Sequence, residues 1–150
     1  MEYAKEFWKS SVDAINLLEL IIREENIDCD WERNGHCSLA FKQSHFNELP
    51  EYADWLKMEM GHEKTIVPKE KLKSEIGTDE YFGGISDESS AWLHPAKFVF
   101  GLAKSVENLG VSLFEKTRVD SINRISNGFE LITKKGKLNS KDVVIATNGY

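Results

Sequence analysis

The sequence predicts an α+β fold, in which a mixed β-sheet is covered by long helices and is followed by a β-meander. Two observations lead to this prediction. Apolar residues recur at helical spacing over residues 2–25 and 95–109, and short strand-like runs separated by glycine turns fill residues 118–146. The composition, with 41% hydrophobic and 29% charged residues among 150, is that of an ordinary globular chain. It excludes intrinsic disorder, collagen-like repeats and a disulfide scaffold.

The net charge and the length of the apolar stretches argue against several classes of protein. The 25 acidic and 19 basic residues give a net charge of −6, which argues against a nucleic-acid binder. The stretch Leu17–Ile22 is interrupted by Glu19 and is far shorter than the roughly 20 residues that span a bilayer. The N-terminus lacks a signal-peptide pattern, and two cysteines are typical of a reducing compartment. We therefore expect a cytoplasmic protein without a membrane span.

The first expected element is an amphipathic helix over residues 2–25. Its apolar stripe is formed by Trp8, Val12, Ile15, Leu18 and Ile22. The Asn34-Gly35 pair, flanked by residues 28–33 and 36–42, then predicts a β-hairpin with a primed turn.

A second helix is expected from Ser44 as N-cap to Met60, with Gly61 as its C′ residue. Pro50 should kink or restart this helix. An extended piece over 65–67 leads to Pro68 as the first helical residue of a helix over 69–76, which Gly77 closes. Residues 81–85 then predict a strand, with close backbone approach at Gly83 and Gly84, and 86–93 predict a loop.

The clearest helix of the second half begins at His94-Pro95 and ends before Gly110. Its expected buried stripe consists of Phe98, Leu102, Val106 and Leu109. Strands are expected over 111–114, 118–125, 129–133 and 137–139, with turns at Asn127-Gly128 and at residues 135–137. Residues 142–146 read as a short apolar strand buried on both faces.

This last strand leaves two interpretations open in equal measure. A strand buried on both faces needs a neighbour on each side, which favours an excised piece of a larger protein. The alternative is a natural C-terminal strand in a small sheet.

Residue spacing alone assigns no catalytic residue. Cys29, His36 and Cys37 lack the second ligand pair of a structural zinc site, so packing is favoured and no metal site is predicted. Ser89 and Ser90 lie close to Asp87 and His94 in sequence, but neighbours in one loop seldom reach triad geometry. The sequence also contains neither a Gly-x-Gly-x-x-Gly fingerprint nor a Walker motif.

Several short motifs follow one another in a characteristic order over nearly the whole chain. They are Ile27-Asp28-Cys29-Asp30, Leu72, Ile76-Gly77, Tyr81-Phe82-Gly83-Gly84, Asp87, His94-Pro95, Gly101-Leu102-Ala103, Gly110-Val111, Val119 and Val143-Val144-Ile145-Ala146-Thr147-Asn148-Gly149-Tyr150. Their order resembles the interior of the FAD-dependent amine and amino-acid oxidoreductases, the D-amino-acid oxidase-like superfamily. Among its branches, the cysteine-aspartate pair and the Leu-His-Pro segment look most similar to gamma-glutamylputrescine oxidoreductase.

The resemblance implies an incomplete part of a two-domain FAD oxidoreductase fold. Residues 1–110 would be a substrate-domain-like portion, and residues 111–150 a partial FAD-domain-like portion with the meander and the terminal strand. The implied reaction is oxidation of a C–N bond of a small amine or amino acid, such as gamma-glutamylputrescine. FAD would act in the parent protein. The 150 residues alone would not retain it and would be inactive, because the pyrophosphate of such cofactors sits at a fingerprint helix that is missing here.

Site residues follow from the resemblance by position. Val119 matches a residue whose backbone contacts the adenine, and Ala146, Thr147 and Asn148 match a segment beside the cofactor. By residue type alone, Val119 reads as a core valine. The substrate side would include Asp87, Trp92 and His94. By residue type alone, Trp92 reads as a packing aromatic and His94 as a helix-entry residue.

Two other functions stay open. A free-standing α+β binding or interaction module should unfold cooperatively as a monomer, whereas a fragment should expose apolar surface and dimerise through unpaired strand edges. A small hydrolase around Ser89-Ser90 ranks last and predicts esterase activity.

Overall fold

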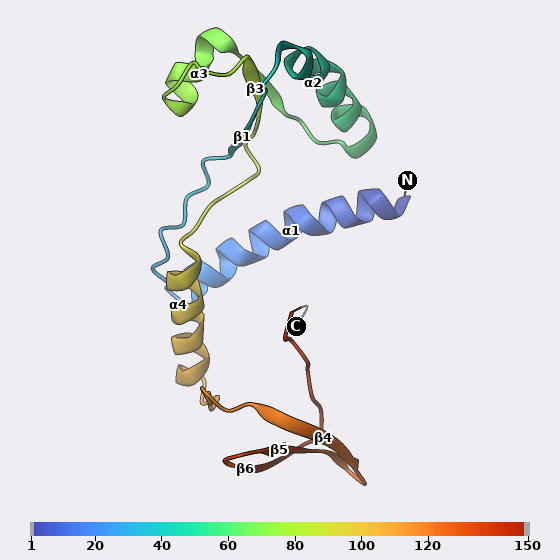
Figure 1. Ribbon diagram of the computed structural model, residues 1–150, viewed down its shortest axis with the longest axis vertical. Helices are drawn as coiled ribbons and strands as arrows, with labels where there is room; N and C mark the ends of the chain where they lie inside the picture. Colours follow the sequence, from blue (N-terminus) through green and yellow to red (C-terminus); the bar gives the residue numbers. More distant parts are fainter. Residues whose placement is uncertain (1, 149–150) are drawn as a thin grey trace. The chain divides into compact units, whose positions relative to one another are not determined.

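The computed structural model describes residues 2–148 and divides the chain into two compact units, one ending at Leu109 and the other beginning at Gly110 (Figure 1). The first unit contains four α-helices, one π-helical turn and three strands, and the second contains three strands. The predicted α+β class is therefore confirmed. Gly149 and Tyr150, which end the closing motif of the sequence, lie outside the described residues.

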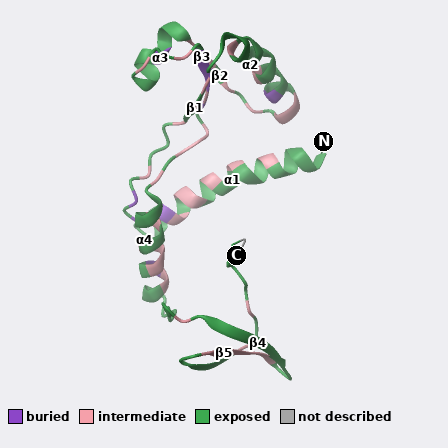
Figure 2. Ribbon diagram, in the orientation of Figure 1, coloured by how far each residue is buried: buried purple, intermediate pink, exposed green. Residues whose placement is uncertain are grey.

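Helix α1 (Glu2–Glu24) is formed where the apolar periodicity predicts it. Its C-terminal half carries Leu18, Ile21 and Ile22 into a core cluster that also holds residues from α4 and from the segments that precede β1 and α4. The other members of this cluster are Ile27, Cys29, Trp31, Leu93, Phe98 and Leu102. The N-terminal half is more open, since Tyr3 and Phe7 are exposed. Figure 2 shows the burial concentrated at the C-terminal end of α1 and in the sheet.

The sheet of the first unit has the order β1-β3-β2, with β1 (His36–Leu39), β2 (Thr65–Pro68) and β3 (Gly83–Asp87). The sequence predicts a mixed sheet, whereas both strand pairs here are antiparallel. The reason is that β3 lies between β1 and β2 and runs against both. Helices α2 (Gln43–Trp55) and α3 (Lys69–Ile76) contact β2 and β3, while α1 contributes to the separate core cluster.

The predicted hairpin around Asn34-Gly35 is wrong. Gly35 does have a left-handed backbone (φ 78°), but the chain does not reverse there. Instead, β1 pairs with β3, and Glu32 forms a bridge with Trp92. The Gly35 amide donates to the Ser90 carbonyl at 3.2 Å. The segment before and within β1 therefore pairs with β3 and the residues after it, and not with its own neighbours across a local turn.

The second helical region differs from the prediction in three details. Lys42 is the N-cap of α2, so Ser44 lies inside the first turn, and the helix continues through Pro50 without restarting. After Trp55 the chain forms a π-helical turn, η1 (Leu56–Met60). Gly61 then ends the helix with φ 65°, as predicted. Leu56 in this turn is almost fully buried, so the turn is packed against the rest of the first unit.

Glycines allow the strands of the first unit to approach closely, as the sequence predicts. A Cβ on Gly84 would lie 2.7 Å from the Ser38 carbonyl oxygen, and one on Gly83 would lie 2.2 Å from the Phe46 ring. Asp87 extends β3 two residues beyond the predicted end of the strand. Pro68 is the N-cap of α3 rather than its first residue, and Gly77 closes α3 with φ 79°.

Helix α4 (Pro95–Asn108) begins with Pro95, and His94 is its N-cap. Phe98 and Leu102 of the predicted stripe pack against the core cluster. Leu109 was expected in the same stripe, but it lies beyond the last helical residue and its side chain is 75% exposed. Gly110 follows with φ 85°.

The second unit is the predicted meander. Strands β4 (Val119–Ile125), β5 (Gly128–Thr133) and β6 (Gly136–Ser140) pair in sequence order, and both pairs are antiparallel. Residues 111–114 and 142–146 were expected as strands, but neither segment pairs with any described strand. An apolar run adopts a strand only where a neighbouring strand meets its backbone groups, and Val144 and Ile145 are exposed.

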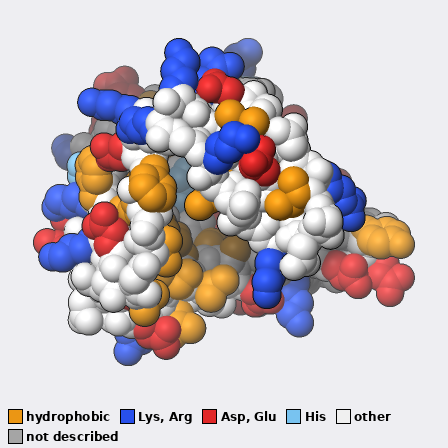
Figure 3. All heavy atoms as spheres, turned by 90° about the horizontal axis from the view of Figure 1, so that it is seen from below, with side chains coloured by type: hydrophobic (Ala, Val, Ile, Leu, Met, Phe, Trp, Pro, Cys, Tyr) orange, Lys and Arg blue, Asp and Glu red, His pale blue; other side chains and the backbone are white. Residues whose placement is uncertain are grey.

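The surface carries many apolar side chains among the charged ones, and Figure 3 shows both kinds side by side on the viewed face. The most exposed of them include Tyr3, Phe7, Met58, Phe100 and Phe114. Within the described residues, no helix is long and apolar enough to cross a membrane.

Candidate functional site

The chemically densest group of the first unit surrounds Asp87 at the end of β3. The Asp87 side chain is buried and accepts two hydrogen bonds at Oδ1, from the Ser89 hydroxyl at 2.6 Å and from the Ser89 backbone amide at 3.1 Å. These bonds arise because the chain turns directly after the strand, and an aspartate can hold the amide two residues further on. The carboxylate thus fixes the start of the loop that follows.

The second oxygen of Asp87 faces the segment that enters β2. Oδ2 lies 2.9 Å from Nε2 of His62 and 3.3 Å from Nζ of Lys64. Antiparallel pairing of β2 with β3 brings these residues together, although they are more than twenty positions apart in the sequence. We call His62, Lys64, Asp87 and Ser89 the Asp87 cluster.

Hydrogen bonds keep Asp87 ionised in spite of its burial. Burial raises the pKa of the carboxyl, but the hydrogen bonds from Ser89 and His62 outweigh that effect and lower the pKa to about 2. The group therefore carries a full negative charge at neutral pH. Its role is that of a fixed anion rather than a general acid or base.

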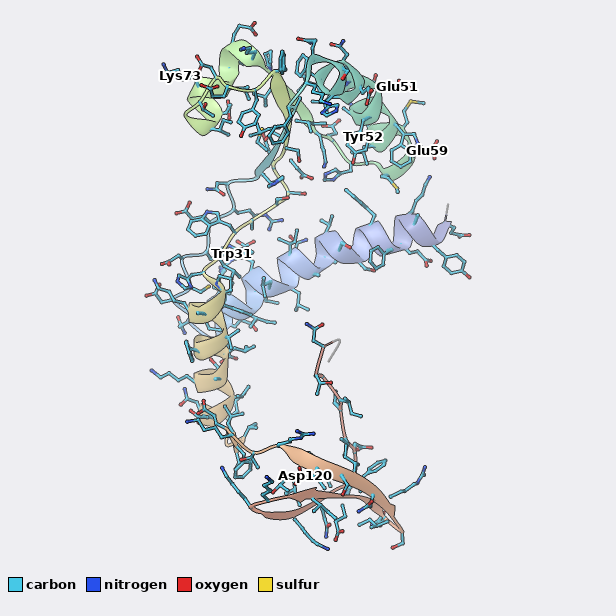
Figure 4. The ribbon with its side chains drawn as sticks, in the orientation of Figure 1. Trp31, Glu51, Tyr52, Glu59, Lys73 and Asp120 are labelled. Carbon is cyan, nitrogen blue, oxygen red and sulfur yellow. The ribbon has the colours of Figure 1, made fainter. Side chains whose placement is uncertain are left out.

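Aromatic side chains close the cluster from two helices. The Trp8 ring of α1 meets the His62 ring edge-on, with centroids 4.8 Å apart. Lys64 Nζ lies 5.9 Å from the centre of the Tyr52 ring of α2, and Tyr52 in turn stacks with Trp55. Figure 4 labels Tyr52 on α2 and Glu59 on the following π-helical turn. The charged side chains of the cluster are 12–14% exposed, which strengthens their mutual attraction relative to fully solvated charges.

The two other residues predicted for the substrate side also have partners. The Trp92 indole Nε1 donates to Glu32 at 3.3 Å, and its side chain is 46% exposed. Nδ1 of His94 accepts from the Lys97 amide at 3.4 Å and caps α4. Asp87, Trp92 and His94 therefore lie along one continuous stretch, in which Asp87 and His94 hold nearby backbone amides and Trp92 contacts the side chain of Glu32. Their contact with substrate stays a prediction.

The serine-centred hydrolase does not form in this structure. The hydroxyl of Ser89 donates to Asp87, and His62 contacts the same carboxylate, so the acid stands between serine and histidine. A catalytic triad requires the histidine to contact the serine. His94, the base suggested by the sequence, instead caps α4.

The cysteines are poorly suited to act as nucleophiles. Burial raises the pKa of the Cys29 thiol, and the nearby carboxylates of Asp30 and Asp28 raise it further. Burial also raises the pKa of the Cys37 thiol, with a smaller contribution from the charge of Glu75. Both thiols are free. Among residues 2–148, His, Cys, Asp and Glu side chains form no group of three or more that could hold a metal ion.

One orphaned polar atom lies in the core cluster. The indole Nε1 of Trp31 is buried and has no hydrogen-bond partner within the described residues. Figure 4 labels Trp31 on the segment between α1 and β1. Apolar side chains of the same cluster surround this tryptophan.

The second unit contains a hollow of about 320 Å³ on the meander. Val119, the residue predicted beside the adenine, lines it together with three other apolar side chains, two threonines and two lysines. The complete lining is Phe114, Thr117, Val119, Leu131, Thr133, Lys135, Gly136, Lys137 and Leu138. The contact of Val119 with the adenine stays a prediction. Ala146, Thr147 and Asn148 lie exposed after β6 and do not line this hollow.

Sequence reasoning found Asp87 but missed its partners. His62 and Lys64 carry no local signal, because only the pairing of β2 with β3 brings them to Asp87. Ser89 was considered as a nucleophile, whereas its spacing two residues after an aspartate could have indicated a turn.

These features coincide with a known class of proteins. The pattern of the DAO family, described as FAD dependent oxidoreductase, matches residues 1–150, and the chain therefore belongs to this family. A protein of Haemophilus influenzae named "Probable oxidoreductase OrdL" is 33% identical over 148 residues, which are 98% of this chain and 34% of that protein. Gamma-glutamylputrescine oxidoreductase of Escherichia coli is 25% identical over 129 residues, which are 86% of this chain and 30% of that enzyme.

Solved structures share the fold. Glycine oxidase from Geobacillus kaustophilus aligns with a TM-score of 0.74 and 21% identity, over 87% of this chain and 36% of that one. L-proline dehydrogenase from P. horikoshii aligns with a TM-score of 0.73 and 17% identity, over 91% of this chain and 37% of that one. The chain spans about a third of the length of the curated relatives it matches.

Proposed function

We propose that this chain is part of an enzyme that uses FAD to oxidise a C–N bond of an amine or amino acid. The observation that carries the proposal is the family match over residues 1–150. The structural neighbours, which include a glycine oxidase and an L-proline dehydrogenase, support an amine or amino-acid substrate. When bound, FAD supplies the two-electron acceptor for this chemistry, and protein side chains orient the substrate.

Gamma-glutamylputrescine is the proposed substrate. The resemblance of the Leu-His-Pro segment supports it, as does the 25% identity to the Escherichia coli enzyme named for that compound. Glycine and L-proline are the competing substrates, because the structural neighbours are named for them.

We assign the two portions of the chain to two tasks. Residues 1–110 would form part of the substrate domain, with the loop after Asp87 on the substrate side. Residues 111–150 would form part of the FAD domain, with Val119 against the adenine and Ala146, Thr147 and Asn148 beside the cofactor. The division of the chain into units at Leu109 and Gly110 and the hollow at Val119 support this assignment.

The 150 residues alone are expected to bind no FAD and to be inactive. Their sequence has no Gly-x-Gly-x-x-Gly, so a helix N-terminus of that kind cannot hold the pyrophosphate. Dimerisation through the edges of β1, β2, β4 or β6 is expected for this chain in isolation. A cytoplasmic location also stays a prediction.

The test uses the complete protein of which these residues form part. Its flavin content is measured by absorption, and reduction of the bound flavin is followed without oxygen after addition of gamma-glutamylputrescine, glycine or L-proline. Rapid reduction by one of them supports the proposal. Stoichiometric FAD that none of these or other primary and secondary amines can reduce would overturn it.

The FAD assignment has its own variant pair. Val119 is 41% exposed, so a charge at this position is desolvated only when a bound flavin covers it. Val119→Asp should therefore lower flavin occupancy about tenfold or more, because covering an unpaired charge costs over the 1.4 kcal/mol of a tenfold effect. Ser121→Asp adds the same charge to the same strand at a residue that does not line the hollow. Equal flavin content in both variants would remove Val119 from the cofactor site.

A further inference from the structure

The carboxylate of Asp87 is largely occupied by its own neighbours. An ionised carboxylate offers about four lone-pair positions. In Asp87, the amide and hydroxyl of Ser89 donate to Oδ1, His62 contacts Oδ2 at 2.9 Å, and Lys64 forms an ion pair with Oδ2 at 3.3 Å. The residue is also only 8% exposed. An amine substrate would have to displace one of these partners to reach it.

We propose that Asp87 is a positioning residue that holds the loop of residues 88–92, and with it the half-exposed Trp92, in place on the substrate side. This inference rests on the proposed function, which puts that loop beside the substrate. Asp87 acts through Ser89 and the backbone. It does not touch the substrate, which differs from the role that the resemblance implies for it.

The loop is held at both ends. At its start, the Ser89 amide and hydroxyl are bound to Asp87, and the Ser90 amide lies 3.5 Å from the Asp87 carbonyl. At its end, the Trp92 backbone exchanges two hydrogen bonds with Glu32. Between these points the Ser90 carbonyl accepts from Gly35. The Trp92 side chain therefore projects from a segment that has little freedom.

The surroundings leave Asp87 little room to move. A Cβ on Gly35 would lie 2.9 Å from the Asp87 carbonyl oxygen, so the backbone of β3 and the segment before β1 are in close contact. In addition, Trp8 packs on His62, and Lys64 lies over Tyr52. Helices α1 and α2 thus support the two groups that bind Oδ2. Asp87 is held by His62 and Lys64 of the segment before β2, and its carboxylate in turn holds Ser89 of the loop.

The experiment compares Asp87→Asn with Glu88→Gln in the complete, FAD-containing protein. Both changes remove one negative charge, but Glu88 is exposed. Hydrogen exchange of the amides of residues 88–92 is measured by mass spectrometry, and kcat and KM are measured with the amine that reduces the flavin. In Asp87→Asn we expect exchange about tenfold faster and KM about tenfold higher, the size of one lost charge-assisted hydrogen bond. Flavin content and kcat should change little.

Glu88→Gln should leave exchange and KM close to the wild-type values. A structural role alone would slow kcat, lower flavin content and raise KM together, so an effect confined to KM and loop exchange supports positioning. Unchanged exchange and unchanged KM in Asp87→Asn would overturn the inference. A large loss of kcat with unchanged loop exchange would also overturn it, since Asp87 would then act directly in the reaction.

A second pair covers the case in which Asp87→Asn does not fold. Ser89→Ala removes only the hydroxyl contact, and Ser89→Thr keeps a hydroxyl. We expect faster loop exchange and a higher KM in the alanine variant and near wild-type values in the threonine variant. The same result in both variants would contradict the inference. A wild-type protein whose flavin no amine reduces would refute the proposed function, while the exchange measurement would still report whether Asp87 holds the loop.

Discussion

The main chains of Glu32 and Trp92 exchange two hydrogen bonds, with N···O distances of 3.0 and 2.9 Å. The two residues are 60 positions apart, and the Trp92 indole adds a third contact to the Glu32 side chain. They join the segment between α1 and β1 to the segment between β3 and α4. The ribbon that begins as the β1–β3 pair therefore continues toward the core cluster.

The first prediction concerns these backbone amides. In the folded, intact protein, the amides of Glu32 and Trp92 should exchange with deuterium at similar, slow rates, because each donates to the other residue. The amide of Glu88, on an exposed residue of the same loop, should exchange faster. Nuclear magnetic resonance detects each amide separately. Fast exchange at Trp92 with slow exchange at Glu32 would disprove the pairing.

This pairing also shows where sequence reasoning reached its limit. Helices α1 and α4 and the meander were predictable, because apolar periodicity and glycine turns are local signals. Asn34-Gly35 gave an equally strong local signal, but the strand that pairs with β1 lies about fifty residues later. The contacts of Asp87 with His62 and Lys64 depend on the same long-range pairing. A single sequence does not indicate which distant strand pairs with a given strand.

The prediction of a strand over residues 142–146 was wrong for another physical reason. The apolar residues of this segment predicted a strand buried on both faces, but Val144 and Ile145 are exposed, because a strand needs a partner for its backbone groups. None of the described strands pairs with it. Apolar composition favours burial of the segment, but whether the segment forms a strand depends on a pairing partner.

The second prediction concerns acid stability. The pKa of Asp87 is lowered from 3.8 to about 2 in the folded protein, so the folded state binds its proton less readily than the unfolded state does. Asp87 therefore stabilises the fold above about pH 4, and this contribution is lost as the pH falls through about 2. Its size is about 2 kcal/mol.

Asp87→Asn should accordingly unfold more easily than the wild type at pH 6, and the difference should shrink by about 2 kcal/mol toward pH 2. Urea titrations at several pH values measure the free energy of unfolding. Glu88→Gln, with its exposed side chain, serves as the control and should follow the wild type. A difference that stays constant with pH would show that the variant acts through packing rather than charge.

The third prediction concerns the cap of α4. The His94 side chain accepts from the Lys97 amide at a long 3.4 Å, so this N-cap is weak. Aspartate is a preferred N-cap and also interacts favourably with the positive end of the helix dipole. We expect His94→Asp to raise the free energy of unfolding by about 0.5–1 kcal/mol and His94→Ala to lower it by a similar amount. Denaturant unfolding measures the stability of both variants and of the wild type. A His94→Ala variant as stable as the wild type would mean that His94 does not cap the helix.

The last prediction concerns the close approach of β1 and β3. A Cβ on Gly84 would lie 2.7 Å from the Ser38 carbonyl oxygen and 3.0 Å from Cys37 Sγ, so Gly84→Ala must push the two strands apart. Gly77 gives a matched control, because its left-handed backbone (φ 79°) strains an alanine but no atom lies within 4 Å of the added Cβ. Gly77→Ala should cost about 1 kcal/mol of backbone strain. Gly84→Ala should cost about 3 kcal/mol, the upper range for overpacking, and should also loosen the Asp87 cluster at the end of the same strand. Thermal unfolding measures the first effect, and hydrogen exchange of residues 88–92 measures the second. A Gly84→Ala protein as stable as Gly77→Ala would mean that β1 and β3 are further apart than the structure shows.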